Sequence, residues 1–416
     1  MPGLARRTTR LSGAWRAKTS TMAIWIFVQY LICDNMRFST LLPCLLAIAG
    51  PVLAQQGNLN ISNPGTAAYE SAVVEIPWAT VAKAYPQVDT AQLRVVRADN
   101  GQEVAYQLEK KGGSAVQNLL VQVTVAPKGS VGLVLSKGKP TPVKPMTYGR
   151  YVPERYDDFA WENDRVAFRI YGKALNGRSD NAYGSDIWAK RTPELIINKW
   201  YKQNDYHKDN GDGLDYYKVG LTLGAGDVGV FLNDSIQYIH NYTTWEVLDN
   251  GPLRTTFRVK YDPYTFKGVT VTQAKTISLD AGAQLSKIRV DVTHTAPGAL
   301  PMVAGIVLRP EESPLLLDDK NGVLGYWEPK HGPDGTIGVG CVFPGKSGGM
   351  MRKYGHGLAR LAVKSGEGIT YYSGGAWDKA GLITSSDAWF AYLQAQANRL
   401  RQPLVVTTSA PRKAGR

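Results

Sequence analysis

The feature that most restricts the fold of this chain is a series of long segments between Val228 and His294 in which apolar and polar residues alternate. Six of them follow one another, at residues 228–232, 236–241, 244–249, 254–261, 269–279 and 285–294. Alternation with a period of two is typical of strands that bury one face. Residues 250–252 and 280–282 contain the glycine, asparagine and proline of turns. Successive antiparallel strands with little helix predict a large β-sandwich.

The residues before this region predict a smaller β domain at 57–145. It contains alternating segments at 72–76, 92–96, 119–125 and 131–135, and residues 77–85 suit a short helix. The lysine- and proline-rich run 137–145 is typical of a linker. We therefore expect an all-β chain, with the small β-sandwich domain at 57–145 and a large β-sandwich domain at 146–405. A basic, disordered tail is expected at 406–416.

Outside the central series, the large domain has further strand-like and helix-like segments. Strands are predicted at 166–171, 304–308, 338–343 and 368–373. A short helix is predicted to begin at Pro193 and to end near Trp200, because proline favours the first position of a helix. Ser386 and Asp387 can cap a helix over 388–401, which Pro403 would end.

Residues 1–54 are predicted to be a signal peptide region. From Met36, a basic residue and an apolar run lead to Val52 and Ala54, which suit the −3 and −1 positions of a cleavage site. The true start is then Met36, and the preceding residues reflect a start codon placed too early. A membrane anchor is the alternative, but neither apolar run reaches the roughly 20 residues that span a bilayer. We expect a periplasmic or secreted protein with no stable membrane insertion after cleavage.

Charge and cysteine content narrow the range of partners. The net charge is +13, and removal of residues 1–54 leaves +8. In an exported protein this excess suits an acidic oligosaccharide and argues against nucleic acid as the partner, although colloidal solubility explains it equally well. Of the three cysteines only Cys341 follows the signal region, so no intrachain disulfide is expected.

The densest group of reactive side chains lies in one polar stretch, residues 200–220. It contains the proton-transfer candidates Tyr206, His207 and Tyr217 and the cation Lys208. Its charges and glycines predict a long loop, and loops of this kind often carry function. A solvated, charge-balanced loop is the simpler interpretation.

Aromatic residues mixed with arginines form further candidate binding sites. Side chains of this kind can stack on sugar rings and fork onto carboxylates or sulfates. The candidates for substrate binding are Arg155, Trp161, Trp188, Arg191, Lys208, Tyr372 and Trp377. An ion-paired seam between domains or an aromatic core would explain most of the same residues.

The chain also resembles a known family. The resemblance rests on the segments YDDFAWENDRVAFRIYG, DIWAKRTPELIINKWY, YHKDNGDGLDYYKVG, TWEVLDNGPLRTTFRVKY and YYSGGAWDKAG. They are similar to those of a secreted family known as domain of unknown function 4861, over nearly the whole mature chain. The resemblance implies a galactose-mutarotase-like super-β-sandwich. It also implies an origin in gene clusters that dismantle acidic polysaccharides, and similarity to an oligosaccharide dehydratase active on ulvan fragments.

The chemistry that the resemblance implies is a β-elimination across C4 and C5 of a uronic acid, of dehydratase or lyase type. It needs a base for the proton beside the carboxylate and a cation to neutralise that carboxylate. The predicted catalytic residues are His207, Tyr206, Tyr217, Arg254 and His331. Among the other histidines, His240 and His294 lie in alternating strands and are expected to be wall residues.

Three other functions stay open. A glycoside hydrolase needs two placed carboxylates, and the chain offers too many acids to select a pair. A mutarotase-like epimerase and a non-catalytic carbohydrate-binding protein are the others. No cofactor is expected. A structural divalent cation is left open, with Asp209, Asp212 and Asp215 as weak ligand candidates, because Gly211 breaks the EF-hand spacing.

Overall fold

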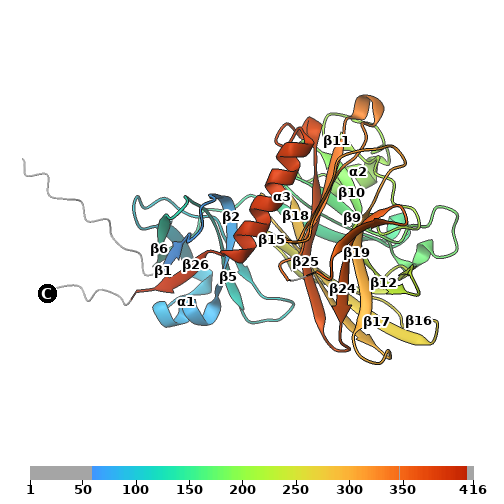
Figure 1. Cartoon of the computed structure of the whole chain (residues 1–416). Coiled ribbons are helices and arrows are strands. Elements are labelled where there is room, and N and C mark those ends of the chain that lie inside the picture. Colours follow the sequence, from blue (N-terminus) through green and yellow to red (C-terminus); the bar gives the residue numbers. More distant parts are fainter. Residues whose placement is uncertain (1–58, 346, 410–416) are drawn as a thin grey trace, which may run out of the picture. The chain divides into compact units, whose positions relative to one another are not determined.

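The computed structural model of the protein describes residues 59–345 and 347–409. The predicted signal peptide region and residues 410–416 of the predicted tail lie outside the described residues. The described chain is mostly β, and its named strands pair antiparallel in five sheets (Figure 1). The all-β, super-sandwich prediction is confirmed. No helix within the described ranges is long and apolar enough to cross a bilayer.

Two sheets enclose the first hydrophobic core. One has the order β26-β1-β6-β3, with β26 at Val405–Thr408, β1 at Leu59–Ser62, β6 at Ser130–Lys137 and β3 at Leu93–Arg97. The other has the order β2-β5-β4, with β2 at Tyr69–Pro77, β5 at Asn118–Val125 and β4 at Tyr106–Glu109. Buried valines, leucines and isoleucines from both sheets pack together, as the alternation in the sequence predicted.

The last strand corrects the prediction for the tail. Val405–Thr408 were assigned partly to a disordered tail, but they form β26 and pair with β1, Leu59 opposite Thr408. The sequence VVTT consists of β-branched residues, which favour an extended backbone and can complete an open sheet edge. Figure 1 shows this red strand beside the blue N-terminal strand.

Two larger sheets form the main sandwich. The five-stranded sheet has the order β13-β12-β19-β24-β23, with β12 at Ala225–Leu232, β13 at Ser235–Tyr238, β19 at Leu300–Val307, β23 at Met350–Lys353 and β24 at His356–Val363. The nine-stranded sheet has the order β14-β15-β17-β18-β25-β22-β21-β20, with β16 beside β17. One core cluster joins residues of both sheets, such as Val230, Met302 and Ile288.

Six strands of the nine-stranded sheet agree with predicted segments, whereas β16, β20 and β21 were not predicted. The strands of this sheet are β14 at Thr244–Asn250, β15 at Arg254–Lys260, β16 at Tyr264–Phe266, β17 at Val269–Asp280, β18 at Leu285–His294, β20 at Leu315–Asp318, β21 at Val323–Trp327, β22 at Ile337–Val342 and β25 at Gly368–Trp377. Burial alternates along β17 and β18, as their sequences require.

The remaining sheet, β11-β10-β9-β8-β7, carries most of the candidate site. Its strands are β7 at Thr147–Val152, β8 at Asp158–Asn163, β9 at Ala167–Ile170, β10 at Asp186–Lys190 and β11 at Gly213–Leu214. Every residue of β8 and β10 is buried, including Asp158, Glu162, Asp186 and Lys190. Strands buried on both faces do not alternate, so these two were not predicted.

Three α-helices complete the described fold. Helix α1, at Trp78–Ala84, agrees with the prediction, and α3, at Ser386–Arg401, is capped by Ser385, whose hydroxyl accepts a hydrogen bond from the Ala388 N–H. Helix α2 begins at Ile197 rather than at the predicted Pro193, and it ends at Gln203. The buried Glu162 carboxylate accepts hydrogen bonds from the N–H groups of Ile196 and Ile197. These N–H groups at the start of the helix have no partner within it, so the carboxylate fixes the point at which α2 begins.

Candidate functional site

The loop from Asn204 to Gly213 is held in place at both ends. Asn204 adopts a left-handed conformation, with φ of 51°, and ends α2. At the other end, Gly213 has φ of 125°, and a Cβ there would collide with the carbonyl oxygen of Ala189 on β10. Within the loop, the Asp209 carboxylate accepts the N–H groups of Gly211 and Gly213. The loop therefore has a defined conformation, fixed at both ends and by its own hydrogen bonds.

His207 projects from this loop, and one of its two ring nitrogens is engaged in a hydrogen bond. Its Nδ1 lies 2.9 Å from the carbonyl oxygen of Asp215. A carbonyl oxygen can only accept, so Nδ1 carries the hydrogen, and the neutral ring keeps its lone pair on Nε2. The side chain is 68% exposed. His207 is thus oriented by the backbone and presents the atom that can accept a proton.

Beneath His207 lies a buried group of charges, which we call the Arg169 cluster: Arg169, Asp158, Asp186 and Asp215. The guanidinium Nη2 lies 2.5 Å from Asp186 Oδ2 and 2.9 Å from Asp215 Oδ2, and Nη1 lies 3.6 Å from Asp158 Oδ2. All four side chains are at most 6% exposed. The Asp215 carboxylate also lies 3.9 Å from Nδ1 of His207.

The Arg169 cluster has more carboxylates than cations. Burial raises the pKa of Asp158 to about 7, against the opposing charge of Arg169 and Arg155. Burial, together with the charge of Asp186, also raises the pKa of Asp215. The interior of a protein disfavours uncompensated negative charge. Burial therefore favours the protonated form of these two carboxyls, one of which lies next to His207.

A second imidazole, that of His331, is held by the residue that follows Asp215. The ring of His331 stacks on Tyr216, with centroids 4.6 Å apart and planes within 10°. Its Nδ1 lies 3.1 Å from Asp334 Oδ2, and the side chain is 52% exposed. Because Asp215 holds His207 and the next residue, Tyr216, holds His331, two histidines far apart in sequence are supported by adjacent residues.

Arg191 and Trp377 link the two segments that carry these histidines. The Arg191 guanidinium lies over the Trp377 ring, 4.9 Å from its centroid, and forms an ion pair with Asp209. Trp377 Nε1 donates to the carbonyl oxygen of Asp334, at 2.7 Å. These contacts, joined along the chain between Asp215 and Tyr216 and between His207 and Asp209, link a set of residues that we call the histidine face: His207, Asp215, Tyr216, His331, Asp334, Trp377, Arg191 and Asp209. Within it, Asp215 and Trp377 are each only 3% exposed. Lys208 is exposed in the same loop.

Besides the buried Trp377, four predicted aromatic residues lie in the core and outside the histidine face. Trp161 and Trp188 are each 1% exposed, Tyr206 is 4% and Tyr217 is 5%. Trp188 stacks on Trp200 and Tyr206. The Tyr217 hydroxyl is buried with no hydrogen-bond partner among the described residues, and burial raises its pKa well above the usual value. These rings support the loop from below.

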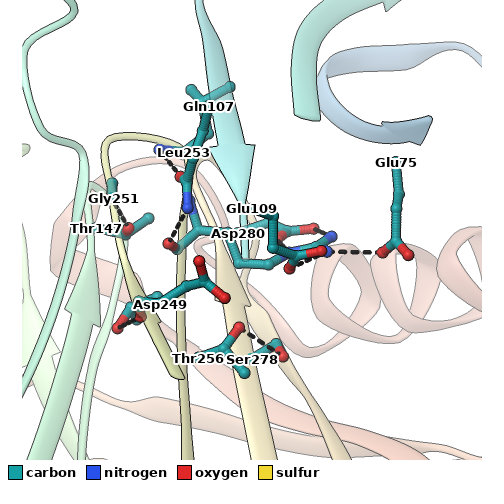
Figure 2. Close-up of polar contacts among 12 residues, drawn as sticks. Glu75, Gln107, Glu109, Thr147, Asp249, Gly251, Leu253, Thr256, Ser278 and Asp280 are labelled. Atoms are coloured by element: carbon teal, nitrogen blue, oxygen red, sulfur yellow. Dashed lines mark hydrogen bonds and ion pairs between the residues drawn. The ribbon is translucent and has the colours of Figure 1, made fainter. Parts of the chain in front are cut away.

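Arg254 and Tyr372 lie in a different part of the chain. Arg254 contacts Glu75 at 2.8 Å, Glu109 at 3.2 Å and Asp280 at 2.5 Å, which we call the Arg254 network (Figure 2). Tyr372 lines a cavity next to that network. Arg155 packs against the Tyr156 ring at 5.2 Å, and its Nη1 is buried without a hydrogen-bond partner in the described chain.

The three weak metal-ligand candidates each face a cation. Asp209 pairs with Arg191, Asp212 with Lys199, and Asp215 with Arg169. Across residues 59–345 and 347–409, no three His, Cys, Asp or Glu side chains come together as a set of metal ligands.

Sequence reasoning missed Arg169, Asp186, Tyr216 and Asp334. The first two had a usable signal, because a charged residue set among apolar and aromatic neighbours, as in FRIYG and DIWAK, indicates a buried ion pair. Tyr216 and Asp334 had none, since their importance comes from a contact between distant segments.

Comparisons with known proteins agree with the predicted family. "Uncharacterized protein P7" from Formosa agariphila is 31% identical over 281 residues, which cover 62% of this chain and 69% of that protein. Two solved structures from Enterococcus faecalis are similar in fold, each at 12% identity over 86% of this chain. One is titled a glycosyl hydrolase family 38 protein, with a TM-score of 0.48, and the other an α-mannosidase, with a TM-score of 0.45.

The chain spans about half of these two structures, 49% and 46%, and their likeness concerns the fold alone. The family is shown more directly, because one family model matches residues 61–406. The chain therefore belongs to the family described as domain of unknown function DUF4861.

Proposed function

We propose that the protein is an exported carbohydrate-active enzyme that catalyses β-elimination on uronic-acid-containing oligosaccharides, with the histidine face as its active site. The observation that carries this proposal is the state of His207. Its Nδ1–H is committed to the Asp215 carbonyl, which leaves the Nε2 lone pair on an exposed ring. A base fixed in this tautomer is ready to remove a proton from a bound sugar.

In the proposed step, Nε2 of His207 takes the proton from C5 of the uronate. The electron pair of the broken C5–H bond forms the C4=C5 double bond as the C4–O bond breaks. The departing oxygen leaves as water or as the hydroxyl of the next sugar, with a proton from His331, whose Nδ1 is anchored on Asp334. Arg191 would neutralise the substrate carboxylate as charge builds up on it.

The stack of Arg191 on Trp377 supports this role. The ring fixes one face of the guanidinium, so the edge that carries the N–H donors is pre-oriented. Asp209 holds the resting cation and would have to share it with the substrate. We therefore propose Arg191, with Lys208 of the same loop, as the site that selects acidic sugars over neutral ones.

The reaction is tested by incubating the protein with uronate-terminated oligosaccharides and following ultraviolet absorbance. An unsaturated uronate absorbs, whereas the products of hydrolysis do not. We expect His207→Gln to lower the rate by about 100-fold or more, the usual contribution of a general base. Lys202→Ala, an exposed change on α2 outside the histidine face, is the matched control and should leave the rate unchanged.

Other outcomes would identify the alternative functions. Release of reducing sugar without new absorbance would indicate a hydrolase, and faster anomeric equilibration a mutarotase-like epimerase. A protein that binds the oligosaccharide but leaves it intact, with equal affinity in His207→Gln, would be a carbohydrate-binding protein. Any of these results would overturn the elimination mechanism.

A further inference from the structure

A second candidate site lies apart from the histidine face, between β2, the turn from β17 to β18, and α3. It is a cavity of about 450 Å³, with Tyr69, Arg165, Gln284, Tyr392, Gln396 and Arg399 among its lining residues. An adjoining cavity of about 340 Å³ shares Tyr69, Gln396 and Arg399 and continues to Tyr372. Volumes of this size are typical of small-molecule sites, and the cavities share no lining residue with the histidine face.

One wall of the larger cavity carries an unsatisfied acceptor. Gln284 is 7% exposed, and its Oε1 has no hydrogen-bond partner among the described residues. Its backbone is fixed on both sides, because its N–H donates to the Tyr392 hydroxyl at 3.2 Å and its carbonyl accepts from the Gly375 N–H at 3.2 Å. Leaving a buried acceptor unpaired is unfavourable. A ligand hydroxyl that reaches Oε1 would supply the missing donor.

The cavity is also lined by arginines that form few ion pairs with carboxylates. The Arg399 guanidinium donates to the neutral carbonyl of Ala68, at 3.2 and 3.0 Å, and forms no ion pair with a carboxylate in the described chain. Arg165 pairs with its neighbour Asp164 at 3.4 Å. Of the acids in the wall, Asp280 is held by Arg254, and Glu70 is exposed. Arg399 is therefore available to an anion.

We propose that this cavity binds an acidic sugar, a uronate or a sulfated sugar, at a position separate from the histidine face. Gln284 accepts a hydrogen bond from a sugar hydroxyl, and Arg399 holds the anionic group in a charge-assisted hydrogen bond. Tyr69, which lies under the Arg399 guanidinium at 5.7 Å, supplies an aromatic wall. The inference concerns binding alone and does not depend on the elimination reaction.

A fluorescent reporter at the rim can test this cavity selectively. Leu382 lines it and is 58% exposed, and in the chain from Gln55 onward the only other cysteine, Cys341, is buried. Leu382→Cys, labelled with an environment-sensitive dye, is titrated with trigalacturonate, with sucrose octasulfate and with maltotriose. We expect a saturable response to one or both acids and none to neutral maltotriose. The stronger response identifies carboxylate or sulfate as the preferred anion.

Two changes in the cavity complete the test. Arg399→Gln should weaken binding by about tenfold or more, as expected for the loss of a charge-assisted hydrogen bond. Gln284→Leu should weaken binding by about fivefold to tenfold. It removes an unpaired buried acceptor, so it should fold at least as well as the native chain, which covers the case in which Arg399→Gln unfolds. His207→Gln is the control and should leave the response unchanged.

The inference is overturned if neither acid produces a response, if maltotriose binds as tightly, or if Gln284→Leu and a folded Arg399→Gln both keep the native affinity. A failed elimination assay leaves this titration unaffected, so the two proposals can fail separately.

Discussion

Two arginines in this protein each contact three carboxylates, and they do so in opposite surroundings. In the Arg169 cluster the three acids are at most 3% exposed. In the Arg254 network, Glu109 is 3% exposed, but Asp280 is 29% and Glu75 is 39% exposed (Figure 2). Lys111 is a second cation in the Arg254 network, 3.1 Å from Glu75 and 3.6 Å from Glu109, so the two groups differ in cation content as well as in access to water.

This difference reverses the direction of the pKa shifts. Burial raises the pKa of Asp158 to about 7. For Glu75, burial acts in the same direction, but hydrogen bonds and charge from Arg254 and Lys111 outweigh it and lower the pKa. In the network that reaches water, the charged form of Glu75 is favoured. In the sealed cluster, burial favours the protonated forms of Asp158 and Asp215, next to the proposed catalytic base.

Removal of each arginine should show the largest difference. Arg169→Met leaves three carboxylates in the interior without their cation, and we expect a loss of about 3–5 kcal/mol in the free energy of unfolding. Arg254→Met leaves two of its three acids partly solvated, so about 1–2 kcal/mol is expected. Urea denaturation of both variants measures the difference between the two losses in the free energy of unfolding. Equal losses would show that burial does not distinguish the two groups.

The pH dependence of stability should change in Asp158→Asn. The folded pKa, about 7, lies above the unfolded value, about 3.9, so between these values the native state holds a proton that the unfolded chain lacks. This group makes stability fall as pH rises, by about 1.4 kcal/mol per unit at most. Asparagine cannot titrate, so the fall between pH 5 and 7 should become shallower. An unchanged slope would contradict a protonated Asp158.

Glu75→Gln should show the opposite dependence, with a smaller amplitude. A lowered pKa contributes stability above the unfolded value, about 4.3, and that contribution is lost as pH falls through the folded pKa. Glu75 is 39% exposed, so we expect a loss below about 1 kcal/mol at pH 7. The loss should disappear in acid. Unfolding curves at pH 7 and pH 3 give the comparison, and a loss that persists at pH 3 would assign Glu75 a packing role.

The smallest effect is expected for an exposed pair. Lys353 contacts Asp234 at 2.6 Å, with the two side chains 38% and 64% exposed. Lys353→Ala should leave the urea midpoint of unfolding nearly unchanged, because water screens such pairs. It provides the baseline for the other four variants, and a loss as large as that of Arg254→Met would mean that contact distance outweighs burial in this protein.

The sequence predicted the long strands that have one wet face and also the fully buried β9 and β22, but it missed β8 and β10, whose charged residues are buried. The alternating segments 269–279 and 285–294 became β17 and β18 almost without change. Strands β8 and β10 were overlooked because Asp158, Glu162 and Lys190 looked like surface residues. Their charges are neutralised by one another inside the sheet, for example Lys190 by Glu162 at 2.7 Å.

The candidate site was predictable in part for a related reason. The reactive loop was visible as one polar stretch, so His207 and Asp215 could be named together. The contacts that link this loop to His331 and Trp377 depend on how the ends of distant strands converge. The alternation of apolar and polar residues does not contain that information. It also does not say at which end of a strand Arg254 lies, which is why that residue was grouped with the histidines.

The pairing of β26 with β1 has a consequence for how the protein is made. Synthesis delivers β1, β3 and β6 early, but the edge strand that completes their sheet emerges at residues 405–408. At ordinary elongation rates the gap lasts about tens of seconds, during which a nascent sheet edge is open to incorrect partners. A chain that ends before Val405 should therefore aggregate on refolding more readily than the chain that includes β26.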